Sequence, residues 1–85
     1  MILNVTQAEY IDEYRIFLTF NTGHSYSVDL KDILMKENRL IFQPLKDVSY
    51  FKTFTLRLNT IVWENEADFA PEFLLEIALE QKQTA

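Results

Sequence analysis

The residues best suited to chemistry lie in one short stretch that begins at the only tryptophan of the chain. Trp63 is followed by Glu64, Asn65, Glu66 and Asp68. Two of these carboxylates could act as a general acid and a general base if one lay in a dry pocket that raised its pKa. Carboxylates also suit Ca²⁺ or Mg²⁺, but the D-x-D-x-D-G-x5-E pattern of a calcium loop is missing. We therefore predict no metal site, and take Trp63, Asn65 and Asp68 as candidates for a ligand-binding loop.

The same stretch can instead be a structural joint, which is the interpretation we favour. Trp63 would close the end of a small core, with its indole N–H donating to a carbonyl or a carboxylate. Asp68 would accept the N–H of Ala70 in an Asx-turn that leads the chain into Pro71.

Catalytic chemistry finds little support elsewhere in the chain. The single histidine, His24, lies in a predicted turn beside Ser25, which gives only weak support for a catalytic triad. The absence of cysteine excludes a thiolate nucleophile, a thiolate metal site and a disulfide, and one glycine is too few for a glycine-rich phosphate loop. We predict no catalytic residues, no enzymatic activity and no cofactor.

Composition and charge restrict the class of protein. An 85-residue chain that is 48% hydrophobic and 14% aromatic predicts a single domain over residues 1–85 with a dense core. The formal net charge of −5 repels nucleic-acid phosphates and anionic lipids, so we expect no direct contact with nucleic acid and no membrane association. No apolar run is long enough to span a membrane and the N-terminus lacks a signal-peptide pattern, which predicts a cytoplasmic protein.

Alternating apolar residues predict two β-hairpins and an opening strand. Residues 14–20 and 25–29 form the first hairpin, which turns at Gly23, a residue that tolerates positive φ. Residues 53–58 and 60–63 form the second hairpin, which turns at Asn59. The apolar residues at positions 2, 3 and 5 suggest the opening strand.

Capping residues predict where helices begin. Asp29 would cap a short helix, Asp47 a single helical turn, and Pro71 suits the first position of a helix that runs to about Gln81. Residues 42–45 read as an extended connector, because their proline disfavours helix in the residue before it. The predicted fold class is α+β, with a small, mostly antiparallel sheet, one or two short helices and a C-terminal helix.

The C-terminal helix carries more apolar surface than one sheet can cover. Its apolar residues span about two thirds of the helix circumference, opposite an acidic stripe of Glu72, Glu76 and Glu80. The surplus, chiefly Leu75 and Leu79, requires cover from another part of this chain or from another chain. We therefore predict that Leu75 and Leu79 form a partner interface.

Three segments, residues 20–30, 42–47 and 60–74, together resemble the bacterial domain-of-unknown-function family 2442, DUF2442. The family signature Trp-Pro-Asn-Gly-Ala-Asp-Leu is matched at Trp63, Asn65, Ala67 and Asp68, while position 64 has Glu in place of Pro and position 66 has Glu in place of Gly. The resemblance implies an α+β fold with a mostly antiparallel sheet and an uncharacterised activity. It also implies an association with small toxin-like proteins.

Together these observations favour a protein-interaction module that behaves as an antitoxin-like or regulatory partner. The partner would be another protein, such as a basic toxin-like protein attracted by the acidic charge, or a second copy of the chain. Two alternatives stay open: a small-molecule-sensing or enzymatic domain that uses the loop from Trp63 to Asp68, and a homodimeric structural domain.

Overall fold

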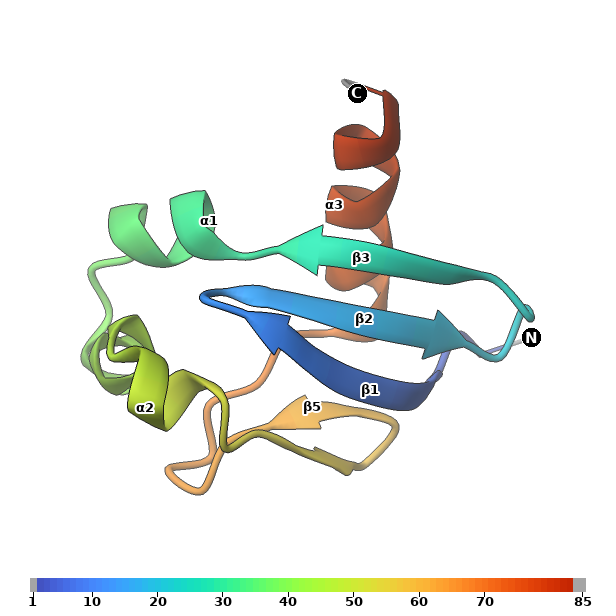
Figure 1. The fold of residues 1–85 in the computed structure, drawn as a ribbon. Helices are drawn as coiled ribbons and strands as arrows, with labels where there is room; N and C mark the ends of the chain where they lie inside the picture. The colour runs from blue at the N-terminus through green and yellow to red at the C-terminus, as the bar shows by residue number, and fades with distance from the viewer. Residues whose placement is uncertain (1, 84–85) are drawn as a thin grey trace.

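A computed structural model describes residues 2–83, and its elements form the predicted α+β arrangement of sheets with short helices and a C-terminal helix (Figure 1). The first three strands form one antiparallel sheet in the order β1-β2-β3, and β4 and β5 form a second, two-stranded sheet. The elements in chain order are β1 (Val5–Asp12), β2 (Arg15–Phe20), β3 (Ser25–Asp29), α1 (Lys31–Lys36), the 3₁₀ helix η1 (Leu40–Lys46), α2 (Val48–Phe51), β4 (Thr55–Arg57), β5 (Thr60–Val62) and α3 (Pro71–Gln83).

The larger sheet has one buried face and one exposed face. Ile16 and Val28 are opposite each other in the register of β2 and β3, and both are fully buried. Their sequence neighbours Phe17 and Ser27 are also paired, but lie on the exposed face. The alternation follows from the two-residue period of a β-strand, which made this hairpin predictable.

The opening strand begins and ends later than residues 2–5, where we expected it. β1 runs from Val5 to Asp12, and the pairing with β2 shifts register between Val5 and Gln7 and again between Tyr10 and Asp12. Each irregularity changes the face to which the following side chains point. The apolar alternation of β1 is interrupted for this reason, and the sequence pattern did not reveal most of the strand.

The second hairpin is confirmed, with a two-residue turn at Leu58 and Asn59. Both residues have positive φ, 52° and 69°, as in the turns that match the twist of hairpin strands. The carbonyl oxygen of Asn59 accepts a hydrogen bond from the N–H of Val5 at 2.9 Å, which joins the hairpin to the start of β1.

The segments between the two sheets differ from prediction in two places. Leu30, not Asp29, is the N-cap residue of α1, although the Asp29 side chain accepts the N–H of Lys31 at 2.9 Å. Residues 40–46 form the 3₁₀ helix η1 instead of an extended connector, because this tighter path buries Phe42 and Leu45, three residues apart on one side. The cap at Asp47 is confirmed: its side chain accepts the N–H of Ser49 at 2.9 Å.

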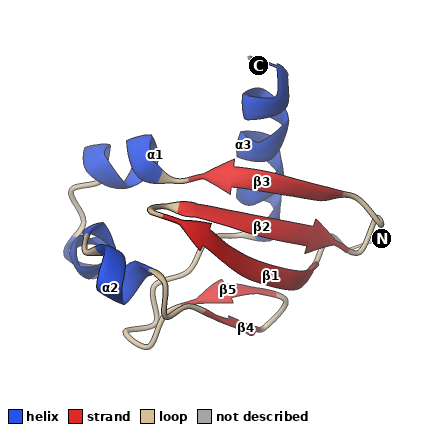
Figure 2. Cartoon of the chain, viewed as in Figure 1, coloured by secondary structure: helices blue, strands red, loops and turns tan. Residues whose placement is uncertain are grey.

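α3 begins at Pro71 as predicted and crosses behind the larger sheet, as the colouring by secondary structure shows (Figure 2). It buries Leu74, Ile77 and Ala78 in the core, whereas the acidic stripe is exposed. No helix among residues 2–83 is long and apolar enough to cross a membrane.

Candidate binding groove

The loop from Trp63 to Asp68 is built as a joint between β5 and α3. Trp63 is 1% exposed, and its indole N–H donates to the carbonyl oxygen of Phe51 at 2.7 Å. The backbone N–H of Trp63 donates to the carbonyl of Ala67, and the carbonyl of Trp63 accepts from the N–H of Glu66, both at 2.9 Å. Asp68 forms a β-bridge with Val62. The loop therefore closes on itself around a buried ring, as the joint interpretation expects.

Asn65 fastens this loop to the rest of the fold. Its side-chain N–H donates to the carbonyl of Ile41 at 2.8 Å, and its backbone N–H donates to the Tyr50 hydroxyl at 3.0 Å. Its side-chain oxygen accepts the N–H of Ala67 at 3.1 Å. The prediction of an Asx-turn at Asp68 is wrong, because the described residues show no bond from the N–H of Ala70 to the Asp68 side chain; an Asx-turn forms at Asn65 instead.

Glu66 occupies the position of the signature glycine with a φ of 73°. This conformation costs a residue with a side chain roughly 1 kcal/mol or more. Its carboxylate pairs with Arg57 at 2.7 Å, next to a shallow hollow of about 500 Å³ beside the loop. The hollow is open and contains Glu64 and Glu66, so the small-molecule hypothesis for this loop stays a prediction.

A second concave surface lies between α1 and α3. One hollow of about 300 Å³ is lined by Ile33, Glu37, Arg39, Phe42, Asp68, Phe69, Ala70 and Phe73. Another of about 270 Å³ is lined by Asp29, Asp32, Ile33, Ile77, Glu80 and Gln81. Ile33 borders both hollows, and Phe73 and Ile77 lie one turn apart on the same face of α3. We call the surface that comprises these two neighbouring hollows the α1–α3 groove.

The floor of the groove is apolar and aromatic. The ring centroids of Phe42 and Phe69 are 5.3 Å apart, and Phe69 stacks on Phe73 at 5.8 Å with an interplanar angle of 11°. Phe42, Phe69 and Ile77 are buried, whereas Phe73 is 39% exposed. A ligand in the groove would therefore meet one accessible aromatic ring, that of Phe73, beside polar groups of the lining residues.

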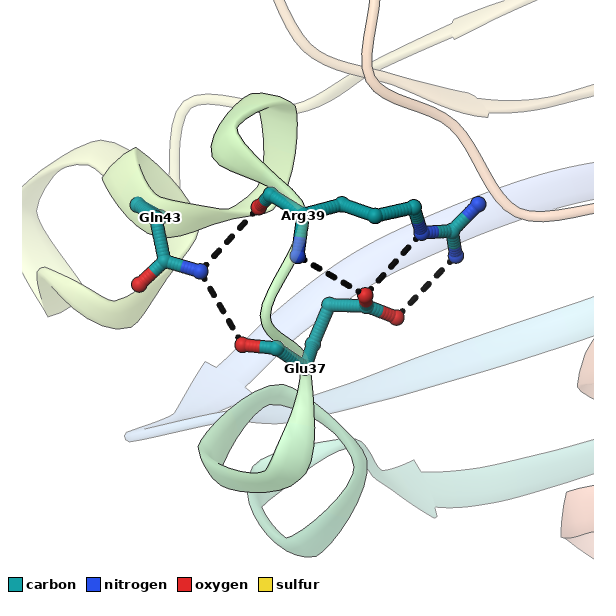
Figure 3. A network of polar contacts seen from close by, with 3 residues as sticks. All are labelled: Glu37, Arg39 and Gln43. Atoms are coloured by element: carbon teal, nitrogen blue, oxygen red, sulfur yellow. Dashed lines mark hydrogen bonds and ion pairs between the residues drawn. The ribbon is translucent and has the colours of Figure 1, made fainter.

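One end of the groove is bordered by an ordered polar network (Figure 3). Arg39 donates from Nε and Nη2 to the two carboxylate oxygens of Glu37 at 2.9 and 3.0 Å. The side-chain amide of Gln43 donates to the backbone carbonyls of Glu37 and Arg39, each at 3.0 Å. The side-chain hydrogen bond from Arg39 lowers the pKa of Glu37 to about 2. The guanidinium carbon lies 4.7 Å from the centroid of the Phe42 ring, so Arg39 covers part of the aromatic floor.

The other end of the groove is acidic. Asp29, Asp32 and Glu80 line the hollow there, and no lysine or arginine is among the described residues that line it. The described residues contain no group of three or more metal-ligating side chains that could hold an ion. The field at this end therefore favours a cationic side chain of a ligand.

The structure distributes the predicted site residues over different surfaces. Of the three loop candidates, Asp68 lines the α1–α3 groove, while Trp63 and Asn65 make hydrogen bonds within the fold. Leu75 is half-buried against the core and Leu79 is 39% exposed, and neither lines the groove. The role of these five residues stays a prediction.

Sequence reasoning did not find Glu37, Arg39, Phe42 and Phe73 as a group. Positions 37 and 39 lie in a segment without apolar periodicity, for which the sequence predicts neither a helix nor a strand. The opposite charges of Glu37 and Arg39, two positions apart, are consistent with an ion pair. They do not indicate that Arg39 lies over an aromatic ring.

Comparison with protein families identifies the family of the chain. A family model described as "Protein of unknown function (DUF2442)" matches residues 5–80. This chain belongs to the DUF2442 family. A search of curated proteins finds no match to it.

The DUF2442 chain is similar to a solved structure, that of Putative DNA Binding Protein NE0471 from Nitrosomonas europaea ATCC 19718. The TM-score is 0.78 and the sequence identity is 26%. The match covers 96% of this chain and 52% of the other, so this chain spans about half the length of the similar protein.

This likeness contradicts our expectation of no direct contact with nucleic acid, because the similar protein bears the name Putative DNA Binding Protein NE0471. The expectation was based on the formal net charge of −5, which sums over the whole chain. Contacts to phosphates and bases are made locally by individual side chains. A negative net charge is therefore insufficient to exclude a nucleic-acid function, and the comparisons name no protein partner.

Proposed function

We propose that this DUF2442 chain is a cytoplasmic protein-interaction module of a regulatory protein, and that it binds a segment of another polypeptide in the α1–α3 groove. The observation that supports this most is the combination of an aromatic floor, exposed at Phe73, with an acidic end formed by Asp29, Asp32 and Glu80. Grooves of this kind bind segments through apolar anchors, and charges at the border set orientation and partner choice.

The groove specifies the chemistry of the segment. An aromatic or aliphatic side chain would pack on the exposed ring of Phe73, and a lysine or arginine about one helical turn away would face Asp32 and Glu80. An apolar anchor contributes most of the affinity in such a complex, while the exposed charge pair contributes mainly to the association rate.

Parallel affinity purification of matched variants tests this function. Phe73→Asp removes the accessible ring, and Glu80→Lys reverses a charge at the acidic end. Glu76→Lys is the control, because it makes the same charge change on α3 outside the groove. We expect a stoichiometric partner to co-purify with wild type and Glu76→Lys, and to fall at least about tenfold with the two groove variants. Equal recovery with all four proteins would contradict the proposal.

Direct DNA binding is a second candidate function, favoured by the name of the similar protein. Arg15, Arg39 and Arg57 are held in ion pairs, so phosphate contacts would be made first by exposed lysines such as Lys31 and Lys36. Fluorescence anisotropy with a labelled DNA duplex at about 50 and 200 mM salt tests this function, since binding through phosphates weakens steeply over that range. An unchanged anisotropy at the lower salt concentration would contradict it.

A further inference from the structure

β3 is an edge strand of the three-stranded sheet, with backbone groups that point away from that sheet. The hydrogen bonds that join this segment to β2 and its preceding turn include the carbonyl of His24 and the N–H of Leu30, both at 2.9 Å. Backbone groups alternate between the two sides of a strand. Those of Ser25, Ser27 and Asp29 are therefore directed outward, where another strand could pair with them.

Both ends of this outward row are closed. The N–H of Asp29 donates to the side-chain oxygen of Gln81 at 2.9 Å, and the Asp29 carbonyl accepts from the Gln81 amide at 2.7 Å. Gln81 thus imitates a neighbouring strand at one position. At the other end, the N–H of Gly23 donates to a carbonyl within the turn at 3.0 Å. Among residues 2–83, the open part of the edge is limited to the backbone groups of Ser25 and Ser27.

A hollow lies next to these two residues. It measures about 310 Å³ and is lined by Ser25, Tyr26, Ser27, Ala78, Gln81 and Lys82. α3 crosses behind β3 and continues past the edge of the sheet (Figure 1). Leu79, at this end of the helix, is 39% exposed. A strand added to β3 would have α3 behind it and would complete the hydrogen bonding of the edge.

We propose that a second copy of this chain occupies this edge, with β3 of each copy antiparallel to the other and the two-fold axis at Tyr26. In this register Ser25 of one copy is opposite Ser27 of its partner, and each serine both donates and accepts. The closed position Asp29 then lies opposite Gly23, which is closed as well. The pairing leaves the Gln81 contact intact and brings no like-charged residues of β3 opposite each other.

The limits of the open edge favour a second copy over a strand of an unrelated protein. A longer strand would meet the Gln81 side chain at Asp29 and the turn at Gly23. Two copies centred on Tyr26 pair only through Ser25 and Ser27, and the residue opposite the closed Asp29 is the partner's Gly23, whose N–H is already bonded within its own turn. Two-fold pairing of identical surfaces is also the commonest form of assembly in soluble proteins.

Cysteine cross-linking tests the register directly, because the chain has no cysteine of its own. At the axis, the two copies of Tyr26 form a non-hydrogen-bonded pair with a Cα separation of about 4.5 Å, which allows a disulfide. Tyr26→Cys should therefore form a covalent dimer on oxidation. Ser27→Cys is the control, since its two copies would be diagonal neighbours about 7–8 Å apart. A failure of folded Tyr26→Cys to cross-link, or equal cross-linking of both variants, would overturn the proposal.

Two measurements on the unmodified protein test the dimer without the Tyr26→Cys substitution. Light scattering from roughly 10 μM to 1 mM should show the mass rising towards that of a dimer. Amide hydrogen exchange should slow with concentration at Ser25 and Ser27, whereas the Asp29 amide, already bonded to Gln81, serves as the internal reference. A constant monomer mass, or exchange that is independent of concentration at both serines, would refute the dimer.

Discussion

The loop from Trp63 to Asp68 and the α1–α3 groove use similar residue types for opposite purposes. In the loop, the tryptophan is buried and the Asn65 side chain bonds to two backbone groups. In the groove, Phe73 is accessible and the acidic end has no basic side chain among its described lining residues. The tryptophan and asparagine of the loop are therefore already engaged in contacts within the fold, whereas the groove still has an accessible ring and acidic side chains.

A conspicuous cluster in a sequence is a weak guide to a binding site. Trp63 and Asn65 attract attention because an aromatic ring and polar groups stand close together in the chain. Availability depends on the bonds that these groups already make, and buried polar groups are almost always bonded. Stability should therefore respond strongly to changes in the loop and weakly to changes in the groove.

The largest difference should come from replacing the aromatic residue of each region. Trp63→Ala removes a fully buried side chain and leaves the Phe51 carbonyl without its indole partner, so we expect a loss of about 3–5 kcal/mol in the free energy of unfolding. Phe73→Ala should cost about 1 kcal/mol, because its ring is partly exposed. Urea denaturation followed by circular dichroism measures both. Equal losses would remove the distinction between the regions.

The polar residues should give a smaller contrast of the same sign. Asn65→Ala leaves the Ile41 carbonyl and the Ala67 N–H without their side-chain partner, which should cost about 1–3 kcal/mol. Asp68→Ala should change stability by less than about 0.5 kcal/mol, because its carboxylate is exposed. Thermal and urea unfolding of the two variants measure these losses. A larger loss of stability in Asp68→Ala than in Asn65→Ala would show that Asp68, and not Asn65, holds the joint.

Glu66→Gly tests the backbone strain inside the loop itself. Glycine adopts a φ of 73° without the steric penalty of a side chain, so this variant should be more stable than Glu66→Ala by about 1 kcal/mol. Both variants lose the exposed ion pair with Arg57, which makes alanine the matched control. A glycine variant that is less stable than the alanine variant would show that backbone strain at position 66 is unimportant.

The smallest effect concerns the polar border of the groove. The hydrogen bond from Arg39 lowers the pKa of Glu37 from its ordinary value of 4.5 to about 2. A carboxyl whose pKa is depressed in the folded state contributes stability above pH 4.5, and this contribution is lost as the pH falls towards 2. NMR titration should find the Glu37 midpoint near 2 in wild type and near 4.5 in Arg39→Met. The same midpoint in both proteins would argue against the ion pair in solution.

Local patterns were sufficient to predict the elements whose residues decide their own conformation. The alternation from Tyr14 to Phe20 identified a strand, Asp47 marked the start of a helical turn, and Pro71 marked the start of α3. β1 was largely missed because its irregular register interrupts the alternation. η1 was missed because burial of its apolar side chains outweighed the preference of an isolated X-Pro segment.

The candidate surfaces required contacts between distant segments. The sequence alone was enough to predict the α+β class, the family and the surplus of apolar residues on α3. The size of the Trp63 ring and its single donor were enough to predict that Trp63 belongs to a structural joint. Only the tertiary structure placed Phe42 beside Phe69 and closed Asp29 with Gln81, a residue 52 positions away. Helix and strand periodicity are local properties of the chain, whereas a groove or a closed sheet edge exists only after remote segments have packed together.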